Sequence, residues 1–201
     1  MRSYPEKLEV YRRNQRRFSK DGYIYPIAKR IIKIAWLDVW DTYHLFCYGK
    51  RIPDGGTYAE IGSYIGGSLL CVYRASRAAR TKINLIGIEP IIRPPLAEYT
   101  KSIPRLKIIR AKSDAARGKI KNDSVDLFFI DGSHGYEQVK RDISNYWSKL
   151  KIGGILLGHD YSGHPLHRGI VRAAKETFGK RLKRLENSRV FMVQKKTKEL
   201  H

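Results

Sequence analysis

Short apolar runs alternate with amphipathic segments along most of the chain. Five of these runs are mostly continuous and rich in Ile, Leu, Val and Phe, which is typical of parallel strands that are buried on both faces. The runs predict strands over residues 58–61, 84–88, 106–110, 125–130 and 155–158.

The segments between and after these strands place their apolar residues at helical spacing. They predict helices over residues 67–80, 96–102, 136–150 and 169–178, with a short turn at 114–118. Two further apolar stretches, 182–185 and 190–194, flank Asn187-Ser188 and predict a closing hairpin.

Strand, helix and strand in succession are typical of right-handed βαβ units. The sequence therefore predicts an α/β fold, a Rossmann-like, mostly parallel seven-stranded sheet with helices on both faces and an antiparallel final strand. Ahead of the sheet, apolar residues between positions 30 and 43 predict one amphipathic helix, whose default role is core packing. With 201 residues, we expect a single compact domain, divided into an N-terminal helical cap or substrate-side segment, residues 1–54, and a core, residues 55–201.

The chain is strongly basic, with 40 Lys and Arg against 19 Asp and Glu and a formal net charge of +21. The excess gathers at the ends: residues 1–35 hold ten basic and three acidic side chains, and residues 163–201 hold eleven and three. Basic ends of this kind can bind nucleic acid or an anionic membrane surface. Solvated charge that aids solubility is the simpler interpretation.

The two cysteines, Cys47 and Cys71, fit neither a disulfide framework nor zinc-ligand spacing, which favours a reducing compartment. The beginning of the chain has no apolar run of the signal-peptide type. The most apolar early stretch, residues 23–40, is interrupted by charged residues and is not expected to span a membrane. We therefore expect a cytoplasmic protein with no membrane span.

Polar residues follow each predicted strand, at the edge where open α/β sheets bind their ligands. The stretch from Glu60 through Gly62 and Gly66 to Ser68 follows the first strand and opens a helix. Its glycines permit a tight turn and close approach of a ligand, but the spacing is not that of a dinucleotide or phosphate loop. Glu60 favours an amine-bearing ligand, and Glu89, at the end of the second strand, can accept both hydroxyls of a ribose.

Together, the acidic glycine loop and the acidic end of the second strand resemble the class I S-adenosylmethionine-dependent methyltransferases over roughly residues 55–195. In that family the loop cradles the methionine part of the cofactor and the second acid holds the ribose. The resemblance makes the core, residues 55–201, the cofactor-binding part of the chain. It implies a set of cofactor-binding residues: Glu60, Gly62, Ser63, Gly66, Ser68, Glu89, Ser113 and Asp131.

The stretch Asp131-Gly-Ser-His134, continuing to His159-Asp160-Tyr161, is similar to a metal-dependent branch, the catechol-type and macrolide-sugar O-methyltransferases. The similarity implies that Asp131 and Asp160 bind a divalent cation, with Mg²⁺ expected, and that His134 abstracts the substrate proton. In that branch an Asn ligand follows the second Asp, whereas Tyr161 stands here. Water, His159 or an acid from another loop can fill the third place, and a metal-free enzyme remains an alternative.

These residue types also suit the chemistry. A neutral hydroxyl is a poor nucleophile at pH 7, and a cation held by carboxylates can bind its oxygen, lower its pKa and orient it. An imidazole with the ordinary pKa of about 6.5 can accept the proton.

The sequence thus predicts an S-adenosylmethionine-dependent O-methyltransferase that acts on a hydroxyl of a small molecule, such as a sugar, a phenolic compound or another natural product. Two alternatives stay open. One is an RNA methyltransferase that uses the basic termini, and the other is a non-catalytic binding protein on the same fold. We also expect a homodimer, because lids contributed by a neighbouring subunit are common in the family.

Overall fold

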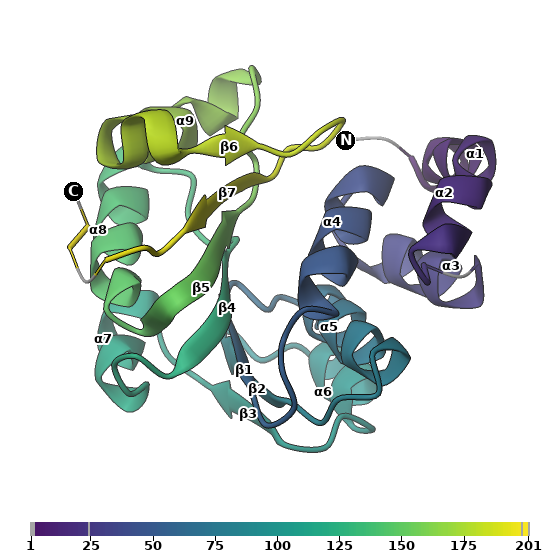
Figure 1. The fold of residues 1–201 in the computed structure, drawn as a ribbon, viewed down its shortest axis with the longest axis horizontal. Helices are drawn as coiled ribbons and strands as arrows, with labels where there is room; N and C mark the ends of the chain where they lie inside the picture. Colours follow the sequence, from purple (N-terminus) through teal and green to yellow (C-terminus); the bar gives the residue numbers. More distant parts are fainter. Residues whose placement is uncertain (1–2, 24, 198, 201) are drawn as a thin grey trace.

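The continuous apolar runs form the strands of one mixed sheet in the computed structural model, which describes residues 3–23, 25–197 and 199–200 (Figure 1). In chain order the strands are β1 (Thr57–Ile61), β2 (Asn84–Ile88), β3 (Leu106–Ile109), β4 (Val125–Ile130), β5 (Leu150–Gly158), β6 (Lys183–Arg184) and β7 (Phe191–Gln194). Their order across the sheet is β3-β2-β1-β4-β5-β7-β6. Strands β1 to β5 are parallel, and β7 is antiparallel to β5 and β6. The predicted Rossmann-like fold is confirmed.

Helices cover both faces of the sheet (Figure 1). One face carries α5 (Gly67–Ala78) and α6 (Pro94–Thr100), and the other carries α7 (Ser113–Ala116), α8 (Tyr136–Trp147) and α9 (Arg168–Phe178). Short 3-10 turns lie at Arg117–Lys119, Pro165–His167 and Gly179–Arg181. Because both faces are covered by helices, the carboxyl ends of the parallel strands are left as the place where a ligand can bind.

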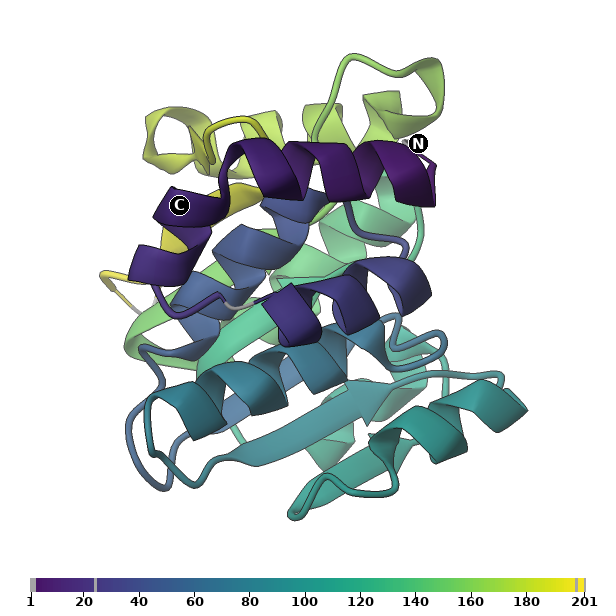
Figure 2. The ribbon, with the colours of Figure 1, turned by 90° about the vertical axis from the view of Figure 1, so that its right-hand side faces the viewer.

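In the described part of the chain ahead of β1, the helices are α1 (Tyr4–Arg13), α2 (Gln15–Lys20), α3 (Tyr25–Ile34) and α4 (Val39–Gly49). They lie on the same side of the sheet as α5, and Figure 2 shows them, in purple and blue, in front of the sheet. Buried residues of these helices belong to one hydrophobic cluster with Tyr58 and Leu127 of the sheet. The boundary between residues 54 and 55 stays a prediction.

The single helix predicted between residues 30 and 43 is wrong, because the chain breaks between α3 and α4. The Asp38 carboxylate accepts a hydrogen bond from Val39 N (2.7 Å), and Asp41 accepts one from Asp38 N (2.9 Å), so a new helix begins there. The Lys7 ammonium donates to the carbonyl oxygens of Ala35 (3.3 Å) and Leu37 (2.8 Å) in the break. The break places Trp36 outside both helices, with 65% of its surface exposed.

Strand β5 begins five residues earlier than predicted, and α8 ends earlier to make room for it. Lys151 and the two glycines after Leu150 hide the strand pattern. Backbone pairing with β4 nevertheless starts at Val125–Leu150 and then shifts register before Leu127. No helix among the described residues has the length and apolarity needed to cross a membrane.

Candidate functional site

A cavity of about 620 Å³ lies at the carboxyl ends of the parallel strands. Residues that follow five different strands line it, as does Trp36 from the break between α3 and α4. The predicted site residues among its lining are Gly62, Glu89, Ser113, Asp131, His134 and Asp160. Residues that lie far apart in the sequence, from Trp36 to Asp160, therefore face one space.

Gly62 brings the loop after β1 against the residue that follows β4. Its φ of +89° is a conformation that side chains other than glycine rarely adopt, and an added Cβ would overlap the carbonyl oxygen of Asp131. Gly62 N donates to Ile88 O (3.0 Å), and Asp131 N donates to Ile61 O (2.9 Å). The loop, β2 and β4 are thus joined at the floor of the cavity.

Glu89 is buried at the end of β2 and faces the cavity. One carboxylate oxygen accepts from Tyr64 N (2.8 Å) and the other from Ile91 N (3.1 Å), and Arg93 lies 3.6 Å away. These bonds fix the carboxylate and leave each oxygen a lone pair for a further donor. Such a group can accept two neighbouring hydroxyls.

Four predicted cofactor residues do not line the cavity, namely Glu60, Ser63, Gly66 and Ser68. Glu60 is fully buried beneath the loop, where one carboxylate oxygen accepts from the Tyr58 hydroxyl (2.5 Å). Burial raises the pKa of Glu60 to about 7.

This burial predicts a pH-dependent stability. Below pH 4.5 Glu60 is protonated in both the folded and the unfolded protein, so it does not change the stability. As the pH rises from 4.5 to about 7, the unfolded protein loses this proton more readily, and the folded protein is increasingly destabilised relative to it. Relative to wild type, Glu60→Gln should gain on the order of 3 kcal/mol in unfolding free energy between pH 4.5 and 8. Urea unfolding at several pH values measures the difference, and Glu98→Gln, on an exposed helix position, is the matched control. Parallel curves for wild type and Glu60→Gln would contradict the prediction.

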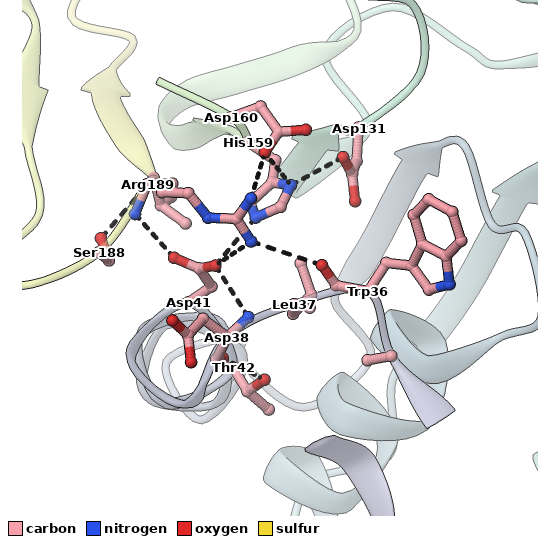
Figure 3. A network of polar contacts seen from close by, with 12 residues as sticks. Trp36, Leu37, Asp38, Asp41, Thr42, Asp131, His159, Asp160, Ser188 and Arg189 are labelled. Atoms are coloured by element: carbon pink, nitrogen blue, oxygen red, sulfur yellow. Dashed lines mark hydrogen bonds and ion pairs between the residues drawn. The ribbon is translucent and has the colours of Figure 1, made fainter. Parts of the chain in front are cut away.

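A network of buried charges adjoins the cavity (Figure 3). The His159 ring lies between two carboxylates, with Nε2 3.0 Å from Asp41 Oδ2 and Nδ1 3.0 Å from Asp131 Oδ1. The Arg189 guanidinium contacts Asp160 Oδ1 (2.7 Å) and Asp41 Oδ2 (3.0 Å). Asp41 therefore joins the two groups that contact the predicted metal ligands.

The charges in this network shift the pKa of its members. Burial alone would lower the pKa of His159, but its contacts with Asp131, Asp160 and Asp41 raise it well above the ordinary value. Burial likewise opposes ionisation of Asp160, yet the bond and charge of His159 and the charge of Arg189 lower its pKa to about 2. The same two partners hold the pKa of Asp41 well below its usual range, against the effect of burial.

His134 stands at the mouth of the cavity. Its Nε2 lies 3.1 Å from Asp160 Oδ2, and 44% of its side chain is exposed. The buried His167 approaches the other oxygen of Asp160 at 3.5 Å. An imidazole that is partly exposed beside a carboxylate can exchange a proton with a bound molecule.

Residues 59–161 match the model of a protein family described as a methyltransferase domain. The chain belongs to this methyltransferase family. The class I S-adenosylmethionine-dependent methyltransferase predicted from the sequence is thereby confirmed.

Individual proteins also resemble this chain. It is 30% identical over 125 residues to the uncharacterized protein R132 of Acanthamoeba polyphaga mimivirus, a match that covers 55% of this chain and about half (54%) of that protein. Its fold is similar to that of the SAH-bound methyltransferase PaMTH1 of Podospora anserina, with TM-score 0.63, 16% identity and coverage of 90% and 86% of the two chains. It is also similar to the O-methyltransferase NovP, with TM-score 0.61, 12% identity and coverage of 80% and 81%.

The cavity of this chain fits S-adenosylmethionine. Its volume lies within the range of small-molecule sites. Gly62 lines the cavity, and the fixed Glu89 carboxylate can accept a ribose diol. Ser113 lines the cavity at the start of α7, where its hydroxyl accepts from Gln138 Nε2 (3.2 Å).

The ligand atoms at the rim also fit a divalent cation. Asp131, His159 and Asp160 offer one atom each within 4.8 Å of one another, and His159 Nδ1 lies 3.0 and 3.5 Å from the two carboxylate oxygens. Two atoms at adjacent corners of an octahedron, bound to Mg²⁺ at about 2.1 Å, lie about 3 Å apart. When the histidines are neutral, the net charge of the network is −2, from the carboxylates of Asp41, Asp131 and Asp160 and the guanidinium of Arg189. A divalent cation balances this charge and takes the place of a proton on His159 Nδ1.

Sequence reasoning missed Asp41 and Arg189. The pair Asp38-x-x-Asp41 ahead of an apolar run is a helix-start signal that marks the beginning of α4. Nothing in the sequence marks Arg189, because its approach to Asp160 depends on β7 lying next to β5.

Proposed function

We propose that the chain is an S-adenosylmethionine-dependent O-methyltransferase that acts on a hydroxyl of a small molecule, such as a sugar or a phenolic compound, with a divalent cation. The observation that carries the proposal is that His134, Asp131 and Asp160 line the same cavity as Gly62 and Glu89. NovP, which shares the fold, is an O-methyltransferase, the activity proposed here.

In this proposal the chain binds the cofactor along the rim. The Gly62 loop faces the methionine part, Glu89 accepts the two ribose hydroxyls and Ser113 lies beside the adenine. S-adenosylmethionine supplies a methyl group activated by the sulfonium charge. His134 lines the same cavity, so an acceptor hydroxyl bound beside it would be held close to the bound cofactor.

The acceptor hydroxyl is activated by residues of the chain. Asp131 and Asp160 would hold Mg²⁺, with His159 as the third ligand, and the ion would lower the pKa of the hydroxyl. His134 accepts the hydroxyl proton, and Asp160, 3.1 Å from its Nε2, stabilises the imidazolium. The oxygen–carbon bond forms as the carbon–sulfur bond breaks, which yields a methyl ether and S-adenosylhomocysteine.

Transfer of radiolabelled methyl groups tests the proposal. The protein is incubated with labelled S-adenosylmethionine and either a panel of phenols and sugars or purified tRNA and rRNA, with and without EDTA. We expect label in a small molecule, its loss in EDTA and its return with excess Mg²⁺. Label in RNA alone would favour the RNA methyltransferase, and no calorimetric binding of S-adenosylhomocysteine would favour the non-catalytic protein. Small-molecule transfer that EDTA leaves unchanged would contradict the role of the cation.

A further inference from the structure

Two charged side chains from outside the family segment, one buried and one partly buried, meet at the predicted metal ligands. Asp41 belongs to α4, near the N-terminus, and Arg189 lies just before β7, near the C-terminus. Neither lies within residues 59–161. In Figure 3 they lie beside His159 and Asp160, and the Arg189 guanidinium also donates to the carbonyl oxygen of Trp36 (3.5 Å).

Asp41 is the centre of this arrangement. It is 0% exposed, and its two oxygens accept from four donors: His159 Nε2 (3.0 Å), Arg189 Nη2 (3.0 Å), Arg189 N (2.7 Å) and Asp38 N (2.9 Å). An aspartate needed only to begin α4 would require the last of these bonds alone. The other three tie α4 to the end of β5 and to the β6–β7 hairpin.

We propose that Asp41 and Arg189 are positioning residues that orient the ligand atoms of His159 and Asp160 toward the divalent cation of the proposed function, on which this inference rests. Asp41 accepts the Nε2–H of His159, so that Nδ1 is the nitrogen left to face Asp131 and Asp160. The Nη1 group of Arg189 holds the Asp160 carboxylate, while Nη2 and the backbone N hold Asp41.

Geometry favours this role over a purely stabilising one. A buried imidazole can present either nitrogen to a ligand, and a carboxylate on one nitrogen fixes both the tautomer and the ring orientation. The backbone of Asp160 does not by itself fix where the carboxylate points, because the side-chain torsions can adopt several rotamers. Arg189 settles it through a 2.7 Å charged hydrogen bond.

Binding of Mn²⁺ to the full-length protein tests the inference without an acceptor. Asp41→Asn keeps the shape but offers one acceptor oxygen in place of two, so an NH₂ group must face one of the four donors. We expect the Mn²⁺ dissociation constant, measured by electron paramagnetic resonance, to rise about 10–100-fold. S-adenosylhomocysteine binding, measured by calorimetry, should stay within about threefold because Glu89 and the Gly62 loop are untouched.

Lys195→Met is the matched control for lost stability. Lys195 is as deeply buried as Asp41 and donates to Leu150 O (2.6 Å), Trp147 O (3.1 Å) and Asp123 (3.2 Å) at the other end of β5. Its loss should lower the melting temperature and leave Mn²⁺ affinity unchanged. Should Asp41→Asn fail to fold, Arg189→Lys, which keeps the charge but cannot bridge both carboxylates, should weaken Mn²⁺ binding instead.

Nitrogen-15 spectra of the Mg²⁺-loaded protein are a second test of the inference. We expect them to show that His159 carries a proton on Nε2 and none on Nδ1. Wild-type Mn²⁺ affinity in folded Asp41→Asn, or an equal loss in Lys195→Met, would overturn the inference while leaving the proposed function intact. A wild-type protein that binds no Mn²⁺ would overturn the metal part of the proposed function and this inference with it.

Discussion

Replacing His134 with alanine is expected to lower the rate of methyl transfer by a factor of about 10²–10⁴, the usual contribution of a general base. His134 is the partly exposed imidazole that lines the cavity and contacts Asp160. Without it, the acceptor proton must leave to water, and Asp160 has no imidazolium to stabilise.

The measurement is kcat for the acceptor found by radiolabelled methyl transfer, together with calorimetric binding of S-adenosylhomocysteine. We expect kcat to fall while cofactor binding stays within about threefold, because none of the groups that fit the cofactor is removed. His164→Ala removes an exposed histidine from the loop after β5 and is the matched control. A His134→Ala enzyme that keeps more than a tenth of wild-type kcat would exclude His134 as the base.

The rim could be predicted from the sequence because it depends on strand direction alone. Once the apolar runs are parallel strands, the residues that follow them share one edge, and Glu89, Asp131 and Asp160 line one cavity. The direction of a single side chain is harder to predict. Side chains alternate between the faces of a strand, so Glu60 shares the buried face of Tyr58 and lies under the loop.

The N-terminal part of the site could not be predicted in the same way. Helical periodicity runs through residues 30–43, but Lys7, far away in the sequence, binds the carbonyls of Ala35 and Leu37 and stabilises the break. The contacts of Asp41 with His159 and Arg189 join three distant segments. Local pattern carries no information about such contacts, which depend on how helices and hairpin pack against the finished sheet.

Gly62→Ala is expected to destabilise the protein by about 3–5 kcal/mol, at the upper end of single substitutions. Two costs combine at this position. A positive φ costs an alanine roughly 1–2 kcal/mol, and the new Cβ would overlap the carbonyl oxygen of Asp131. Backbone atoms cannot move aside there, because Asp131 N is bonded to Ile61 O.

Two other glycines separate these costs in urea unfolding experiments. Gly55 has a φ of +74° but open space around its Cβ position, so Gly55→Ala measures the backbone cost alone. Gly118 has neither a positive φ nor a close neighbour, and Gly118→Ala should change the unfolding free energy by less than about 0.5 kcal/mol. If Gly62→Ala cost no more than Gly55→Ala, the close approach between the loop and Asp131 would be wrong. Where Gly62→Ala still folds, we expect S-adenosylhomocysteine binding to be lost, because separating the loop from Asp131 opens the floor of the cavity.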